Sequence, residues 1–196
     1  TKNTKKKYIT NSYSRKTSHF LRSTYNCIIS TSKSINDDNS LLNCRIEGLE
    51  KKSPDLVILD RKLKLRKNLK LYKTIKSRRI FLITCAKNNK KTNYLKRKGI
   101  KVIFINSLKD KNDFKNLFLI LKEKGYSRIF FETGLTMINL LIKYKFLNIL
   151  YIFKSNINLN SKGKNYSSSN IIKKIGLKNL INVNLFGDKL YKVKLK

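Results

Sequence analysis

An acidic residue stands between an apolar run and a glycine in residues 130–136, whose sequence is FFETGLT. A carboxylate at the end of a strand can hold a substrate or exchange a proton with it. The glycine lets the backbone approach a ligand closely, and a helix that starts there offers unpaired N–H groups to an anion. The pattern predicts a ligand-binding corner at Glu132 and Gly134; the alternative is a solvated loop carboxylate.

Two further groups of residues have types that suit chemistry. Asp37 and Asp38 stand in a polar stretch, residues 30–45, which we expect to form a long loop. Two acids in a loop could bind a metal or position a hydroxyl, but they more commonly cap a turn. Arg22 stands at the end of an expected helix, where it could complement the helix dipole or bind a phosphate with two hydrogen bonds.

The cysteines and the histidine give no metal or disulfide pattern. Cys27, Cys44 and Cys85 are widely spaced in or beside apolar runs, and His19 is the only histidine. No pair has the spacing of metal ligands, and an odd number argues against a disulfide framework. We therefore predict buried thiols, no metal site and a reducing compartment, the cytoplasm.

The 196 residues carry a formal net charge of +35. Such a charge can indicate a polyanion partner such as nucleic acid. Here, however, Lys and Arg are spread along the whole chain, which is also rich in Asn, Ile, Phe and Tyr. Lys, Asn, Ile, Phe and Tyr all have AT-rich codons, so a low-GC genome can raise them together and explains the charge without a partner. Affinity for anions, including phosphorylated small molecules, stays open. No apolar stretch approaches the ~18 residues that span a bilayer.

Short apolar runs alternate with segments of helical period. Strands are predicted over residues 27–29, 56–59, 80–83, 102–105, 128–131 and 149–153, and helices over residues 14–24, 92–98, 114–121 and 136–144. Gly99 and Gly125 are expected to end two of these helices. Residues 183–186 and 190–195 flank Gly187-Asp188, which predicts an antiparallel hairpin.

This order predicts an α/β fold in which helices flank a mostly parallel central sheet, with an antiparallel C-terminal hairpin. We expect one domain over residues 1–196. Such sheets bind ligands where strands end and helices begin. The chain has no P-loop, no Gly-x-Gly-x-x-Gly and no Gly-x-Ser-x-Gly motif, which argues against a kinase, a Rossmann dehydrogenase and an α/β-hydrolase.

Seven segments, taken in order, resemble a known family. They are residues 8–10 (YIT), 20–22 (FLR), 26–29 (NCII), 34–45 (SINDDNSLLNCR), 54–61 (PDLVILDR), 132–136 (ETGLT) and 146–150 (FLNIL). The set resembles the reductase domain of the bifunctional riboflavin-biosynthesis deaminase/reductase. The first strand of that domain and the deaminase domain would precede Thr1, so the resemblance implies a chain truncated at its N-terminus.

The resemblance implies a dihydrofolate-reductase-like fold and an NADPH-dependent enzyme of riboflavin biosynthesis. Its substrate would be 5-amino-6-(5-phosphoribosylamino)uracil, whose ribosylamine opens to an imine. Hydride from the nicotinamide would then reduce the sugar C1 and leave a ribityl chain. A homodimer or larger homo-oligomer is also implied. The alternatives are a related pyrimidine or pterin reductase of the same fold, and a basic nucleic-acid-binding protein.

The resemblance also implies roles for individual residues. The candidates for relaying a proton to the opened sugar are Asp38, Glu132 and Lys7. Substrate contacts are implied for Lys6, Arg22, Leu42, Arg45 and Glu132, with the two arginines on the phosphate. Cofactor contacts are implied for Tyr8, Ser34, Asp38, Arg61, Gly134, Leu135 and Thr136.

Overall fold

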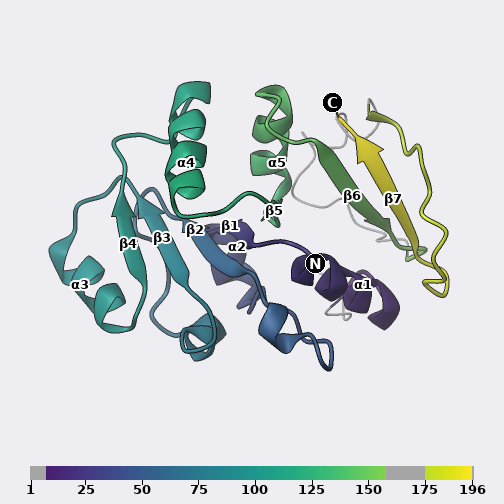
Figure 1. Cartoon of the computed structure of the whole chain (residues 1–196), viewed down its shortest axis with the longest axis horizontal. Helices are drawn as coiled ribbons and strands as arrows, with labels where there is room; N and C mark the ends of the chain where they lie inside the picture. The colour runs from purple at the N-terminus through teal and green to yellow at the C-terminus, as the bar shows by residue number, and fades with distance from the viewer. Residues whose placement is uncertain (1–7, 158–174, 196) are drawn as a thin grey trace. The chain divides into compact units, whose positions relative to one another are not determined.

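A computed structural model describes residues 8–157 and 175–195 of the chain (Figure 1). The chain divides into two compact units, one formed by His19–Gly134 and the other by Thr1–Ser18 together with Leu135–Lys196. Helix α1 (Ser12–Ser23) continues from the second of these into the first. That residues 1–196 form a single domain stays a prediction.

The unit His19–Gly134 is built on a five-stranded parallel sheet with the strand order β4-β3-β2-β1-β5 (Figure 1). Its strands are β1 (Cys27–Thr31), β2 (Asp55–Leu59), β3 (Ile80–Thr84), β4 (Lys101–Phe104) and β5 (Ile129–Phe131). The predicted parallel sheet is therefore confirmed. Its inner strands are continuous apolar runs because both faces of the sheet are covered.

One face of the sheet carries the larger apolar core. Alternate strand residues such as Ile28, Ile58 and Leu82 pack there with Ile35 of α2 (Ser32–Asp38) and Leu95 of α3 (Asn89–Arg97). The helical turns η1 (Glu50–Lys52) and η2 (Lys70–Thr74) lie in the connections on either side of β2, and Leu71 of η2 belongs to the same core.

The opposite face of the sheet contacts α4 (Lys111–Glu123). Phe118 of this helix packs edge-on against Phe131 of β5, with ring centroids 6.0 Å apart. Phe114, Leu117 and Leu121 are fully buried on the same helix, as the predicted spacing of apolar residues required. Asp110 and Asp113 form a capping box that starts the helix.

A short helix replaces the long loop expected over residues 30–45. Thr31 caps α2, since its side-chain oxygen accepts a hydrogen bond from the Ser34 backbone N–H at 3.2 Å. Ile35 is the only apolar residue within α2, so the sequence offered no repeating helical period there. The expectation of a loop is corrected for residues 32–38.

The strand over residues 102–105 is less buried than predicted. β4 is the last strand on its side of the sheet, and Phe104 is 45% exposed. The apolar run resembled an inner strand because sequence gives composition but not strand order.

The second unit contains α5 (Leu135–Lys143), β6 (Ile149–Lys154) and β7 (Lys189–Lys194). β6 and β7 pair in antiparallel register, with Ile149 opposite Lys194. This confirms an antiparallel pair at the C-terminal end. The partner strand differs from the expected residues 183–186, which contribute only one bridge, from Leu185 to Asp188.

Asp188, expected as a turn residue, holds two segments of this unit together. Its carboxylate accepts hydrogen bonds from the Ser14 hydroxyl at 2.6 Å and from the Asn11 backbone N–H at 2.9 Å. These contacts use the carboxylate for tertiary structure, and they place the start of β7 beside the start of α1.

Gly99 and Gly125 end α3 and α4 in the same way. Each has a positive φ, +90° and +85°, and each donates its backbone N–H to a helix carbonyl at 2.8 Å. They differ in one respect: a Cβ at Gly99 would lie 2.7 Å from Ile75 Cγ2, whereas a Cβ at Gly125 would meet nothing within 4 Å.

Gly99→Ala is therefore expected to destabilise the protein more than Gly125→Ala. Both changes place a side chain in the left-handed region, at a cost of about 1 kcal/mol each, and the clash with Ile75 raises the total at Gly99 to about 2–3 kcal/mol. Urea unfolding of the two variants measures the difference. Equal losses would show that Ile75 moves aside without cost.

Candidate functional site

Glu132 lies directly after β5, at the carboxyl edge of the parallel sheet. Its backbone N–H donates to the Ile29 carbonyl at 3.0 Å, and its own carbonyl accepts from the Ser30 hydroxyl at 2.7 Å. Ser30 is buried within β1. Both contacts tie Glu132 to the neighbouring strand, so its side chain starts from a fixed point at the sheet edge.

The Glu132 carboxylate forms a two-pronged ion pair with Arg22, from the last turn of α1. Arg22 Nε donates to Oε2 at 2.9 Å and Nη2 donates to Oε1 at 2.7 Å. A third guanidinium nitrogen, Nη1, donates to the Asn43 carbonyl at 3.0 Å. The Arg22 side chain is 11% exposed and that of Glu132 is 34% exposed, so the pair is partly buried. The two parallel hydrogen bonds fix the orientation of the carboxylate relative to the guanidinium.

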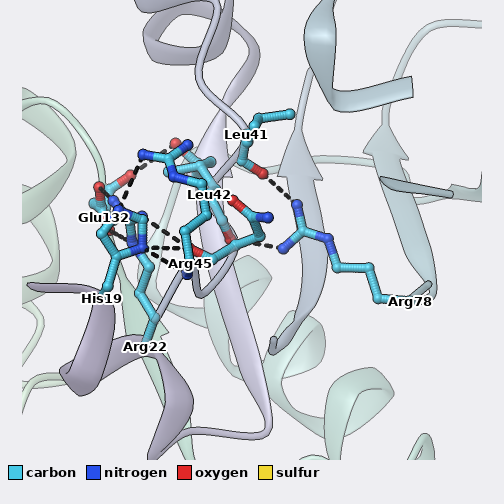
Figure 2. Close-up of polar contacts among 9 residues, drawn as sticks. His19, Arg22, Leu41, Leu42, Arg45, Arg78 and Glu132 are labelled. Atoms are coloured by element: carbon cyan, nitrogen blue, oxygen red, sulfur yellow. Dashed lines mark hydrogen bonds and ion pairs between the residues drawn. The ribbon is translucent and has the colours of Figure 1, made fainter. Parts of the chain in front are cut away.

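His19 stands one helical turn before Arg22 and contacts the segment 43–45. Its Nδ1 lies 2.9 Å from the Asn43 carbonyl oxygen, and its Nε2 lies 3.0 Å from Arg45 Nη2. Figure 2 shows His19, Arg22 and Glu132 gathered beside Arg45. The cluster therefore brings two arginines and one carboxylate around one imidazole.

Arg78 holds the same segment at a different point. Its guanidinium donates to the carbonyls of Leu41, Leu42 (2.6 Å) and Pro54 (3.0 Å), and its Nε donates to Thr74 Oγ1. In Figure 2 it reaches Leu41 and Leu42 from the side away from His19. Leu42 is buried and has a φ of 53°, so Arg78 stabilises a backbone turn that a leucine rarely adopts.

Ser34 joins α2 to the turn after Glu132. Its Oγ accepts from the Gly134 backbone N–H at 3.3 Å and lies 3.0 Å from Thr31 Oγ1. Gly134 is exposed, and a Cβ there would meet only Ser34 Oγ, at 3.9 Å. The backbone at this turn is thus open to close approach by a ligand.

Asp38, at the end of α2, has a raised pKa. The cause is first the loss of hydration on partial burial, then the negative charges of Asp37 and Glu132. The shift favours the protonated carboxyl, so Asp38 holds its proton to higher pH than an ordinary aspartate.

Comparison with known proteins decides the family. The family model for the RibD C-terminal domain matches residues 1–164. The chain belongs to the RibD C-terminal domain family. The riboflavin biosynthesis protein RibD of Aquifex aeolicus (strain VF5) is 28% identical over 147 residues, which are 75% of this chain and 39% of that protein. The chain thus spans less than half the length of this relative.

Solved structures share the fold at lower identity. The riboflavin biosynthesis reductase Rib7 of Saccharomyces cerevisiae matches with a TM-score of 0.72 and 22% identity, over 94% of this chain and 81% of that one. A deaminase/5-amino-6-(5-phosphoribosylamino)uracil reductase of Thermotoga maritima matches with a TM-score of 0.69 and 17% identity, over 94% of this chain and 49% of that one. The RibD C-terminal domain described here has their dihydrofolate-reductase-like fold.

The structure brings five of the implied site residues of this RibD domain to the carboxyl edge of the sheet. Arg22, Arg45 and Glu132 form one cluster through His19, and Ser34 and Gly134 meet beside it. Leu42 lies in the segment that carries Arg45, with its carbonyl held by Arg78.

The other implied residues lie outside this cluster or in the second unit. Arg61, after β2, donates to the Leu108 carbonyl at 3.4 Å and is exposed. In the second unit, the Tyr8 ring lies under the Arg15 guanidinium, 4.4 Å from it. Leu135 and Thr136 form the first turn of α5. Lys6 and Lys7 lie outside the described residues.

Three further expectations concern the burial of the thiols, a metal site and a membrane span. Cys27 and Cys44 are buried, whereas Cys85 is partly exposed, so the prediction of buried thiols is right for two of the three. Within residues 8–157 and 175–195 no cluster of three His, Cys, Asp or Glu side chains suits a metal ion. Over the same ranges no helix has the length and apolarity that crossing a bilayer requires.

Two residues of this site were missed by sequence reasoning, His19 and Arg78. His19 had a usable signal, because it stands three residues before Arg22 and so shares its helix face. Arg78 had none, since its partners are backbone carbonyls that only the folded chain brings together.

The pKa of His19 is lowered from 6.5 to about 4, mainly by burial and then by the charges of Arg22 and Arg45. The unfolded chain therefore binds one more proton than the folded chain between these pH values. The free energy of unfolding is expected to fall as the pH falls through this window, by at most about 1.4 kcal/mol per pH unit. Urea unfolding across the window measures the slope, and His19→Gln should remove that component. An unchanged slope in the variant would contradict the assignment.

Proposed function

We propose that the chain catalyses the NADPH-dependent reduction of 5-amino-6-(5-phosphoribosylamino)uracil to its ribitylamino product in riboflavin biosynthesis. The observation that carries the proposal is the cluster of Arg22, Arg45 and Glu132 at the carboxyl edge of a parallel sheet, in a RibD C-terminal domain. That edge is where α/β sheets bind ligands. The Thermotoga maritima neighbour bears the name of this reductase.

The two arginines differ in how they would meet the substrate phosphate. Three of the Arg22 nitrogens already donate, two to Glu132 and one to Asn43. Arg45 is exposed and meets His19 through one of its nitrogens, Nη2. Arg45 is therefore the principal phosphate ligand in this proposal, because its remaining N–H groups can form a charge-assisted pair with two phosphate oxygens. Arg22 orients Glu132 and adds positive charge.

Glu132 and Asp38 serve the substrate in different ways. Glu132 has its orientation fixed by Arg22, so it can accept hydrogen bonds from the pyrimidine or the opened sugar. The raised pKa of Asp38 means that it stays protonated to higher pH than an ordinary aspartate. This suits a group that donates a proton to the reacting sugar. Lys7 stays a third candidate for relaying a proton to the sugar, on the basis of the family resemblance alone.

The residues present fit the phosphates of a dinucleotide. Gly134 offers an open backbone beside the Ser34 hydroxyl. Leu135 and Thr136, which follow Gly134 in the chain, are proposed as cofactor contacts on the resemblance alone. NADPH, when bound, supplies the hydride that reduces the sugar C1. The chain binds and orients the two partners. Tyr8 and Arg61 are proposed as further cofactor contacts.

The test is NADPH oxidation that depends on the pyrimidine substrate. We expect turnover with NADPH and less with NADH, and formation of the ribitylamino product. A chain that consumes no NADPH with this substrate would overturn the proposal. Turnover of another pyrimidine or a pterin instead would identify a related reductase of the same fold.

Arg45→Ala is expected to raise the KM for the phosphorylated substrate by about 10- to 100-fold, because a charge-assisted phosphate contact is lost. Arg97→Ala removes an equal charge from α3, whose exposed face has no part in the cluster, and is the control. Steady-state kinetics with both variants measure the effect. An equal rise in both would show that net charge, not the Arg45 contact, binds the substrate.

A further inference from the structure

We infer that His19 is a positioning residue, which holds the Arg45 side chain through Nε2 and the Asn43 backbone through Nδ1, and so presets Arg45 for a phosphate. The inference rests on the proposed function for its kinetic part. Its structural part is a statement about one imidazole and can be tested without turnover.

The contacts favour one neutral tautomer of His19. A guanidinium has only donors, so Arg45 Nη2 at 3.0 Å requires an unprotonated Nε2. The proton is then on Nδ1, where it meets the Asn43 carbonyl oxygen at 2.9 Å. In this tautomer both ring nitrogens have a partner, one neutral and one charged.

The opposite tautomer would satisfy different neighbours. With the proton on Nε2, Nδ1 could accept from the Arg45 backbone N–H at 3.2 Å and from Arg22 Nη1 at 3.3 Å. It would also place the Nε2 proton against the Arg45 guanidinium and the Nδ1 lone pair against the Asn43 oxygen. Those two contacts are the shorter ones, and one involves a full charge, so the Nδ1–H tautomer is favoured.

Burial, and after it the charged groups around the ring, keep His19 neutral. Arg22 faces the ring from the same helix, Arg45 from the loop after α2, and Glu132 from the end of β5. Two cations stand against one carboxylate, and that carboxylate is already paired with Arg22. A neutral ring that accepts from Arg45 restrains an arginine beside Arg22 without adding a third positive charge.

His19 forms one hydrogen bond more than a histidine with a purely structural role would need. Packing would be served by the buried ring and its bond to Asn43 alone. The second nitrogen instead engages the side chain of an exposed arginine. Restraining that side chain before the ligand arrives reduces the rotamer entropy lost on binding.

The first test is nitrogen NMR of the ring in the full chain, with any affinity tag removed. His19 is the only histidine, so the ring signals need no assignment. We expect the Nδ1–H tautomer, uncharged from about pH 5 to 8, and a shift of the Nε2 signal on titration with inorganic phosphate. An Nε2–H tautomer, an ordinary titration near neutral pH, or no response to phosphate would each overturn the inference.

The second test uses two amide substitutions that separate the nitrogens. In His19→Gln the amide oxygen can reach the place of Nε2 and accept from Arg45, whereas in His19→Asn the amide can replace only Nδ1. We expect His19→Asn to raise the KM for the phosphorylated substrate by about tenfold, with kcat within about twofold, and His19→Gln to raise it by less than about threefold. The dephosphorylated substrate should show no difference between the variants.

The outcomes separate the two proposals. If both variants raise the KM for both substrates equally, or only lower the melting temperature, His19 is structural and the inference fails. If the wild-type chain shows no reductase activity, the proposed function fails, while the NMR titration with phosphate still decides the role of His19.

Discussion

Replacing Glu132 by glutamine is expected to lower kcat/KM for the pyrimidine substrate by about 10²- to 10⁴-fold, the range typical of a lost acid–base or charge-positioning group. The amide keeps the shape of the side chain but offers one acceptor oxygen, so the two-pronged contact with Arg22 cannot persist. Arg22, with its side chain 11% exposed, would then keep its charge without its carboxylate partner. Steady-state kinetics with NADPH measure the loss.

Asp55→Asn provides a matched control for this prediction. Asp55 also pairs with an arginine, Arg79, at 2.8 Å, but it stands at the start of β2 and therefore at the opposite edge of the parallel sheet from Glu132. The Asp55 side chain is 14% exposed and also accepts from the Tyr126 hydroxyl and the Arg79 backbone N–H, each at 2.7 Å. Asp55→Asn should therefore leave turnover within about twofold while lowering stability by about 1–3 kcal/mol. If the two variants lose activity equally, the Glu132 effect is one of folding and the site is misassigned.

Replacing Arg78 by methionine is expected to lower the free energy of unfolding by about 2–4 kcal/mol. Two opposing effects act. Removing a buried charge relieves the desolvation that lowers the Arg78 pKa to about 10. Against this, the carbonyls of Leu41, Leu42 and Pro54 lose their donor, at about 1–3 kcal/mol for each one left unpaired. The free energy lost at three unpaired carbonyls is larger than the free energy gained by removing one buried charge, so the net effect is destabilising.

The neighbouring arginine is the control for Arg78. The Arg79 side chain is 53% exposed, and its partner Asp55 keeps the hydrogen bond from the Tyr126 hydroxyl when Arg79 is replaced. Arg79→Met should therefore cost about 1 kcal/mol or less. Arg78→Lys keeps the charge but cannot reach all the carbonyls, and an intermediate loss is expected. Urea unfolding compares the three variants. A methionine variant as stable as wild type would show that the 41–45 segment holds its conformation without Arg78.

Loss of Arg78 should also weaken substrate binding at a distance. Leu42 has a positive φ that its carbonyl bond to Arg78 helps to hold, and Arg45 follows three residues later. Release of this turn would let Arg45 leave His19. We therefore expect a higher KM for the phosphorylated substrate in Arg78→Met even where the variant is folded.

The strands and most helices followed from sequence because their physical causes are local. Strands buried on both faces need continuous apolar runs, as residues 56–59 and 80–83 show. Helix α4 needs a repeating apolar face, and its end needs a residue that tolerates positive φ, which Gly125 supplies. Helix α2 was not predicted, because a seven-residue helix with a single apolar residue shows no helical period in the sequence.

Sequence by itself determined which segments form the sheet, and the types of residue at its carboxyl edge: Glu132 after an apolar run and arginines at positions 22 and 45. Only the tertiary structure decided that Arg22 is committed to Glu132, that His19 bridges to Arg45, and that Arg78 holds the intervening backbone. The reason is that these contacts join residues up to 110 positions apart. Their partners include backbone carbonyls, which every residue has and which no sequence pattern can mark.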